Sequence, residues 1–158
     1  MNRAPFLALA LALSLLSGCA GALRTSSIGA HATGIALGDV GETIELERHR
    51  AQLAAVEGAE YREDADAAVD EVRRAWAPAV SAYDAAREVY NGWIDVLRAA
   101  KLAGLEDPVE WARIAARAVR AYGALADALR ALGHEVPALP GVVTDLADTI
   151  AGEPRAED

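Results

Sequence analysis

Apolar side chains recur every seven residues through the middle of the chain, on two parallel lines. One line holds Val69, Trp76, Tyr83, Tyr90 and Leu97, and the other holds Val72, Ala79, Ala86 and Trp93. This spacing is typical of the a/d seam of a helix that packs along another helix. The pattern predicts a long helix over residues 65–97. Pro78 lies inside the seam, but the seven-residue register continues across it, so we expect a kink there and no chain reversal.

A second helix is predicted just downstream, because the residues between the two helices carry stop and start signals. Gly104 suits the left-handed position just past a helix end. Asp107 suits an N-cap, Pro108 the first helical position and Glu110 the third, much as in a capping box. The new helix should run from Pro108 to about Leu132, and the short connection makes it an antiparallel neighbour of the first.

The expected fold is therefore all-α. A long kinked helix and an antiparallel return helix form a hairpin over residues 42–151, and a short capping helix from Val142 to Ile150 closes its open end. Residues 152–158 are expected to be a disordered tail. The second apolar line also continues backward through Ile44 and Leu37, with a break expected at Gly58. In this scheme that upstream segment has no partner within the chain, which favours self-association or coverage by another protein.

The start of the chain has the layout of a secretory signal peptide. A basic segment with Arg3 precedes an apolar run from Ala4 to Leu16, and small residues follow. This run is well short of the about 20 residues that a membrane-spanning helix needs. Charged residues recur from Asp39 onward, so no later span is expected. We therefore assign residues 1–18 to a leader.

The end of the leader, Leu16-Ser17-Gly18-Cys19, resembles the lipobox of bacterial lipoproteins. The resemblance covers the leader only. It implies that the Cys19 sulfur receives a diacylglycerol, that the leader is cut before Cys19, and that the new amino terminus is acylated. It also implies sorting to the outer membrane of a host with two membranes, because Ala20 stands where an Asp tends to hold such proteins at the inner membrane. The alternative is ordinary signal cleavage after Ala22, with Cys19 discarded.

Residues 19–41 are rich in Gly, Ala and Ser, a composition that suits a flexible tether between lipid and domain. An alternative remains open. Gly34, Gly38 and Gly41 fall at helical spacing with Ala30, and such a stripe of small residues would let a partner helix approach closely.

Composition narrows the class of partner. The chain of 158 residues has a net charge of −9 and only 5% aromatic residues. An acidic chain is a poor ligand for nucleic acid. On the second helix Arg113, Arg117 and Arg120 share one face. We interpret this face as a solvated flank with weak pairs to acids on the neighbouring helix, and the alternative is a docking strip for an acidic partner.

No catalytic, cofactor-binding or metal site is expected. The three histidines, His31, His49 and His134, lie far apart in the sequence. Two Glu-x-x-His motifs, His-Glu-x-x-His and Gly-x-Ser-x-Gly are all absent from the sequence.

The sequence thus favours a lipid-anchored envelope protein that acts through its helical surfaces as a structural or interaction module. The alternative is a phage or prophage lysis or exclusion lipoprotein, which neighbouring holin and endolysin genes would favour. An enzyme or ligand-binding domain is the third class.

Overall fold

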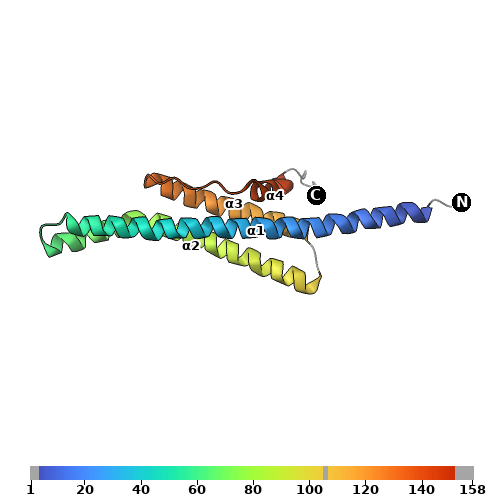
Figure 1. Ribbon diagram of the computed structural model, residues 1–158, viewed down its shortest axis with the longest axis horizontal. Coiled ribbons are helices and arrows are strands. Elements are labelled where there is room, and N and C mark those ends of the chain that lie inside the picture. The colour runs from blue at the N-terminus through green and yellow to red at the C-terminus, as the bar shows by residue number, and fades with distance from the viewer. Residues whose placement is uncertain (1–3, 105–106, 152–158) are drawn as a thin grey trace, which may run out of the picture.

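The computed structural model describes the backbone of residues 4–104 and 107–151, with side chains from residue 23 to residue 148 apart from residues 105–106. The described residues form four helices, α1 (Ala4–Glu57), α2 (Arg62–Ala103), α3 (Pro108–Ala131) and α4 (Gly141–Ala151). α1 is a long, nearly straight helix, and α2 folds back along it (Figure 1). α3 packs on α2, and α4 packs on α3 and α1. The expected all-α hairpin with a short C-terminal helix is confirmed.

The boundary between α2 and α3 follows the signals in the sequence. Gly104 adopts the left-handed conformation at φ 63°, and its N–H donates to the carbonyl of Ala100. Asp107 caps α3 by accepting a hydrogen bond of 3.0 Å from the backbone N–H of Glu110. Pro108 occupies the first position of α3, where its missing N–H costs nothing. These three residues end one helix and start the next.

The structure corrects the flexible tether expected over residues 19–41, because this segment lies in the middle of α1. Ala30, Leu37 and Val40 are buried against the rest of the bundle. The physical reason is that a helix rich in Gly and Ala has small side chains, which let a neighbouring helix approach its backbone. It gains little stability alone, but it packs closely once another helix covers it. The upstream seam also has a partner within the chain, since Ile44 is buried in the same cluster as Trp76 of α2.

The small-residue stripe is where α1 and α2 meet most closely. A Cβ atom on Gly34 would lie 2.5 Å from the hydroxyl oxygen of Tyr90, and one on Gly41 would collide with the hydroxyl of Tyr83. By contrast, a Cβ on Gly38 would have no atom within 4 Å. Two of the three glycines thus accept tyrosine rings from α2, and the third faces away. The alternative interpretation of this segment, a stripe of small residues that lets a partner helix approach closely, is therefore the one that the structure shows. The partner helix is α2.

The core consists of two clusters along the bundle. Around Trp76 of α2, the first cluster joins α1 to the second half of α3 through Leu125 and Leu129. The second cluster surrounds Trp93 and Trp111, which are 0% and 1% exposed. Both tryptophans are therefore core residues, as the place of Trp93 on the seven-residue seam predicted for that residue. Ile44 and Leu97, at opposite ends of the bundle, belong to different clusters.

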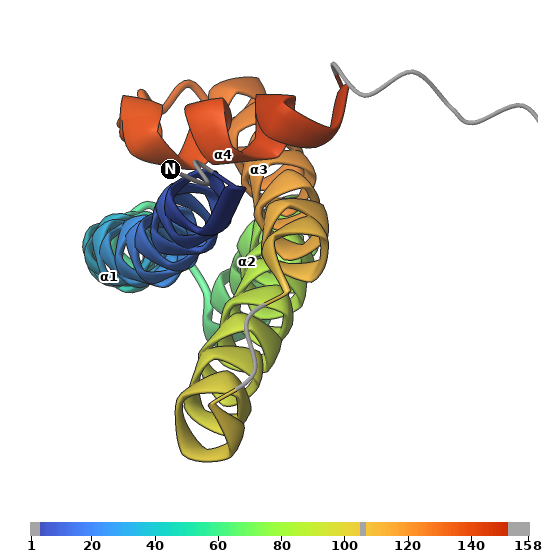
Figure 2. The same ribbon diagram turned by 90° about the vertical axis from the view of Figure 1, so that its right-hand side faces the viewer.

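The connection from α3 to α4 runs back along α3 (Figure 1), and α4 then covers α1 and α3 (Figure 2). Val143 of α4 packs in the cluster of Trp93 and Trp111, so α4 lies toward the closed end of the hairpin and does not cap its open end as expected, because the connection first returns along α3. Tyr122 of α3 donates a 2.8 Å hydrogen bond to the carbonyl of Pro137, which fixes this connection. Burial raises the pKa of the Tyr122 hydroxyl above 10.0, with a smaller contribution from the charge of Asp39. His134 packs against Trp76, with 5.2 Å between the centroids of the two rings. The tail expected at residues 152–158 lies outside the described residues.

α2 continues through Pro78, which confirms that this proline does not reverse the chain. Proline removes one helical hydrogen bond and crowds the preceding turn. Because Pro78 is exposed, its replacement should disturb no core contact. We expect Pro78→Ala to raise the free energy of unfolding by about 1–3 kcal/mol, measured by urea denaturation. A loss of stability would show instead that α2 needs a proline at this position to contact both neighbours.

Candidate functional site

The lipobox residues lie inside α1. Residues 16–19 are helical, and the Cys19 side chain is outside the described residues. The first described α1 side chain that packs on the bundle is Leu23, one helical turn after Cys19. The residue expected to carry lipid is thus joined to the folded body by continuous helix.

A buried hydrogen bond fixes this part of α1 to α2. The indole N–H of Trp93 donates to the hydroxyl oxygen of Ser26 at 3.0 Å, and both residues are 0% exposed. Gly29, one turn on, leaves room for the ring, since a Cβ there would lie 3.3 Å from it. Thr33 satisfies its own hydroxyl by donating to the carbonyl of Gly29 at 2.9 Å. The buried polar side chains of this segment therefore have partners within the chain.

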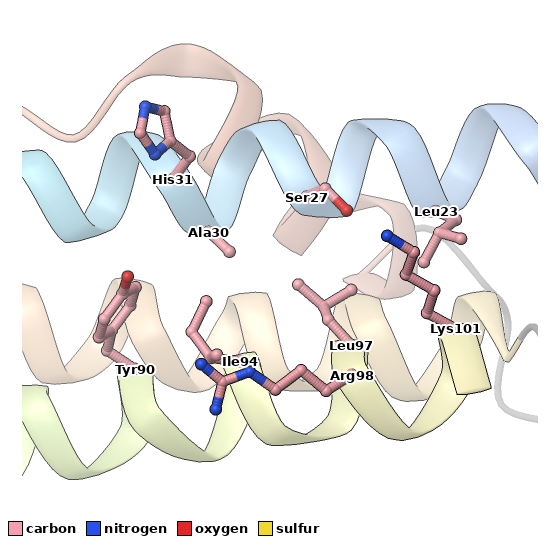
Figure 3. Close-up of a pocket in the computed structure, with 9 residues that line it drawn as sticks. All are labelled: Leu23, Ser27, Ala30, His31, Tyr90, Ile94, Leu97, Arg98 and Lys101. Carbon is pink, nitrogen blue, oxygen red and sulfur yellow. The ribbon is translucent and has the colours of Figure 1, made fainter. Parts of the chain in front are cut away.

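A groove of about 260 Å³ opens between α1 and the last turns of α2, just beyond Leu23 (Figure 3). Its floor is apolar, with Ala30 on α1 opposite Ile94 and Leu97 on α2. Cationic, imidazole and hydroxyl side chains lie along its edges. They are Ser27, His31, Tyr90, Arg98 and Lys101. Arg98 is partly neutralised by Asp95 at 3.4 Å. The groove combines an apolar floor with a basic edge at the end of the bundle nearest Cys19.

The three arginines of α3 stay exposed on its outer surface. Arg113 pairs with Glu110 of its own helix at 2.8 Å, and Arg117 borders a shallow hollow with Glu88 of α2. The expectation of weak pairs to the neighbouring helix is not met, because each ion pair between described residues joins positions three apart on one helix. The docking strip formed with Arg120 stays a prediction.

A second apolar surface, which was not predicted from the sequence, lies on the outward side of α1. Ile28, Ile35, Leu46 and Leu53 are each about half exposed, and we call these four residues the outer stripe. Their spacings of seven, eleven and seven residues were a signal in the sequence. The signal was hidden because the same helix carries its buried face on the opposite side, so apolar residues occur all round it.

Other types of site find little support within the described residues. No three His, Cys, Asp or Glu side chains in this part of the chain gather closely enough to hold a metal ion. Nor does any described helix combine the length and apolar character needed to cross a bilayer. Comparison of the chain with protein-family models, with curated proteins and with solved structures finds no match.

Proposed function

We propose that the protein is a lipid-anchored protein of the bacterial cell envelope that acts as a structural or interaction module through its helical surfaces. The observation that carries the proposal is the leader. A basic start, a short apolar run and Leu16-Ser17-Gly18-Cys19 occur in the order that lipid modification requires. Two or three acyl chains on Cys19 would give stable attachment, whereas one chain gives only marginal binding.

The position of Cys19 on α1 supports an anchor that also orients the protein. Leu23, the first α1 side chain that the structure describes, contacts the bundle one turn after Cys19, so the folded body begins no more than about 6 Å along the helix axis from the anchor. A flexible tether would let the body rotate freely above the bilayer. A continuous helix instead holds one end of the bundle at the lipid surface.

The surface of that end is suited to a bilayer. Leu102, in the last turn of α2, is 89% exposed, and Val109, in the first turn of α3, is 43% exposed. Lys101 lines the groove together with Leu23, which places this turn beside the start of the packed part of α1. Exposed aliphatic side chains with a neighbouring cation are typical of a surface that lies on lipid head groups. In a host with two membranes, Ala20 favours the outer membrane as the site of attachment.

Metabolic labelling with a palmitate analogue tests the anchor. We expect the wild-type chain to be labelled and to sediment with membranes, and Cys19→Ser to lose both label and membrane association, because a hydroxyl does not replace the thiolate nucleophile. Ser17→Ala is the matched control, since it changes the lipobox but keeps a small residue, and it should be labelled as wild type. Separation of the two membranes by density then reports the sorting.

Equal label in wild type and Cys19→Ser would refute lipidation at this residue. Label on wild type together with recovery in the soluble fraction would refute the anchor.

A further inference from the structure

The outer stripe is a straight line on α1. An α-helix turns about 100° per residue, so 18 residues make five full turns. Ile28 and Leu46 are 18 residues apart, as are Ile35 and Leu53, and the two pairs are offset by only about 20° around the axis. The exposed fractions are 51%, 54%, 50% and 48% in chain order. The four side chains therefore form one ridge about 37 Å long.

The stripe lies opposite the buried face of α1. Ala30, Leu37 and Ile44 are at most 8% exposed, and they lie about 160–180° around the helix from the stripe. α2 covers one side of that buried face, and α3 and α4 cover its other side (Figure 2). α1 therefore lies at the edge of the bundle. No described part of the chain covers the outer ridge. α1 thus carries two apolar faces, one used in the fold and one left open.

The spacing of the residues along this ridge, seven, eleven and seven, is the same from both ends. The midpoint of Ile28 and Leu53 falls between residues 40 and 41, and so does the midpoint of Ile35 and Leu46. A second copy turned by 180° about this point would therefore place Ile28 against Leu53 of the other copy and Ile35 against Leu46. A two-fold pair of this kind is the commonest form of homo-oligomer, because each contact occurs twice.

Charges near the stripe distinguish the two directions in which a second copy could pack. Arg24 and Glu57 share the same midpoint, so an antiparallel copy would bring opposite charges together at both ends. A parallel copy would instead place Arg24 against Arg24 and Glu57 against Glu57. Asp39 and Glu42 lie near the centre of the stripe. In either orientation they would face carboxylates of the second copy, which destabilises both arrangements. Charge complementarity therefore favours the antiparallel pair.

We propose that the outer stripe is a self-association surface at which two copies of this chain pack α1 against α1 in antiparallel orientation, centred between Val40 and Gly41. Eight half-exposed aliphatic side chains would bury about 800 Å², less than the about 1,200–2,000 Å² of a standard stable interface. The pair is therefore a weak, concentration-dependent dimer. In this pair the two Cys19 positions would lie at opposite ends, about 64 Å apart along the axis, so it forms between copies that lie along a bilayer or carry no anchor, and not between copies that stand on their Cys19 ends. The inference itself does not depend on lipidation of Cys19.

Disulfide cross-linking in the full chain tests the geometry. Two differently tagged copies, one with Ile35→Cys and one with Leu46→Cys, are expressed together and oxidised in cells. We expect a mixed disulfide between them. Either variant alone should give little, because residue 35 of one copy would lie about 16 Å along the axis from residue 35 of the other, beyond the about 7 Å that a disulfide can span. Leu102→Cys, exposed but off the stripe, is the matched control.

Each other outcome overturns the proposal. Disulfides between identical variants would show parallel packing, and a disulfide to a different polypeptide would assign the stripe to another protein. No cross-link above that of Leu102→Cys would leave the stripe unoccupied by a second copy. Labelling of the wild type with a thiol-reactive reagent reports any free thiol at Cys19, so a failure of lipidation is seen separately from a failure of pairing.

Charge exchange provides a second measurement in the same assay. Arg24→Glu should lower the yield of the mixed disulfide severalfold, and adding Glu57→Arg to the same chain should restore it, because the end pairs reform with their signs exchanged. Neutralising the centre with Asp39→Asn and Glu42→Gln should raise the yield. A yield that Glu57→Arg does not restore would contradict the antiparallel register.

Discussion

Replacing Trp93 with alanine is expected to lower the free energy of unfolding by about 3–5 kcal/mol, the range seen when a large aromatic side chain is removed from a core. Trp93 is 0% exposed and joins three helices, because its ring lies against Gly29 of α1 and belongs to one cluster with Trp111 of α3 and Val143 of α4. Its loss also leaves the Ser26 hydroxyl buried without a partner. Small domains are stable by only about 5–15 kcal/mol, so this one change removes a large share.

Urea denaturation followed by circular dichroism measures this loss of stability. Two further variants help to separate its causes. Trp93→Phe keeps most of the ring but loses the N–H donor, so we expect a smaller loss, of about 1–3 kcal/mol. Leu102→Ala is the control for simple removal of an apolar side chain, and at 89% exposure it should change stability by less than about 0.5 kcal/mol. If Trp93→Ala cost no more than Leu102→Ala, α1 would not be packed on α2 as described.

The second large effect concerns three glycines of α1. Substitution by alanine is expected to raise the free energy of unfolding at one of them and to lower it at the other two. Glycine to alanine inside a helix normally gains about 1 kcal/mol. We expect that gain at Gly38, where an added Cβ meets nothing within 4 Å. Changing Gly34 and Gly41 together to alanine should instead lower stability by about 2 kcal/mol, because each new Cβ collides with a tyrosine of α2 and overpacking outweighs helix propensity.

A further change identifies the colliding atom. In the Gly34→Ala chain, Tyr90→Phe removes the hydroxyl that would lie 2.5 Å from the new Cβ, although the ring carbon behind it, at 2.9 Å, remains close. We therefore expect partial recovery, measured as a double-mutant cycle in urea denaturation. Stabilisation by alanine at all three glycines would contradict the close approach of α1 and α2.

Much of the fold could be predicted from the sequence where local signals and periodicity agreed. Gly104, Asp107 and Pro108 ended α2 and began α3 through backbone chemistry that acts within a few residues. The aromatic seam of α2 identified Trp93 as a core residue because its seven-residue spacing was regular. Such signals need no knowledge of what lies across the core, and the structure confirmed them.

The segment expected to be a tether, residues 19–41, could not be predicted in the same way, because its structure depends on a distant partner. A segment rich in Gly and Ala has little helical stability of its own, so its composition is equally typical of a linker. What makes it helical is the fit of Tyr83 and Tyr90 against Gly41 and Gly34, about 40 to 60 residues apart in the chain. The outer stripe was missed for a related reason, since it becomes visible only once the opposite face of α1 is assigned to the core.

The continuity of α1 constrains the order of events at the membrane. The peptide bond between Gly18 and Cys19 lies within the helix that spans Ala4–Glu57, whereas a peptidase acts on backbone that is locally unwound. If the leader is removed there, this turn must open for cutting before it closes onto the bundle. Cutting then makes Cys19 the first residue of the shortened helix, with the unpaired N–H groups of its first turn at the lipid head groups. Maturation and folding would thus compete for the same few residues.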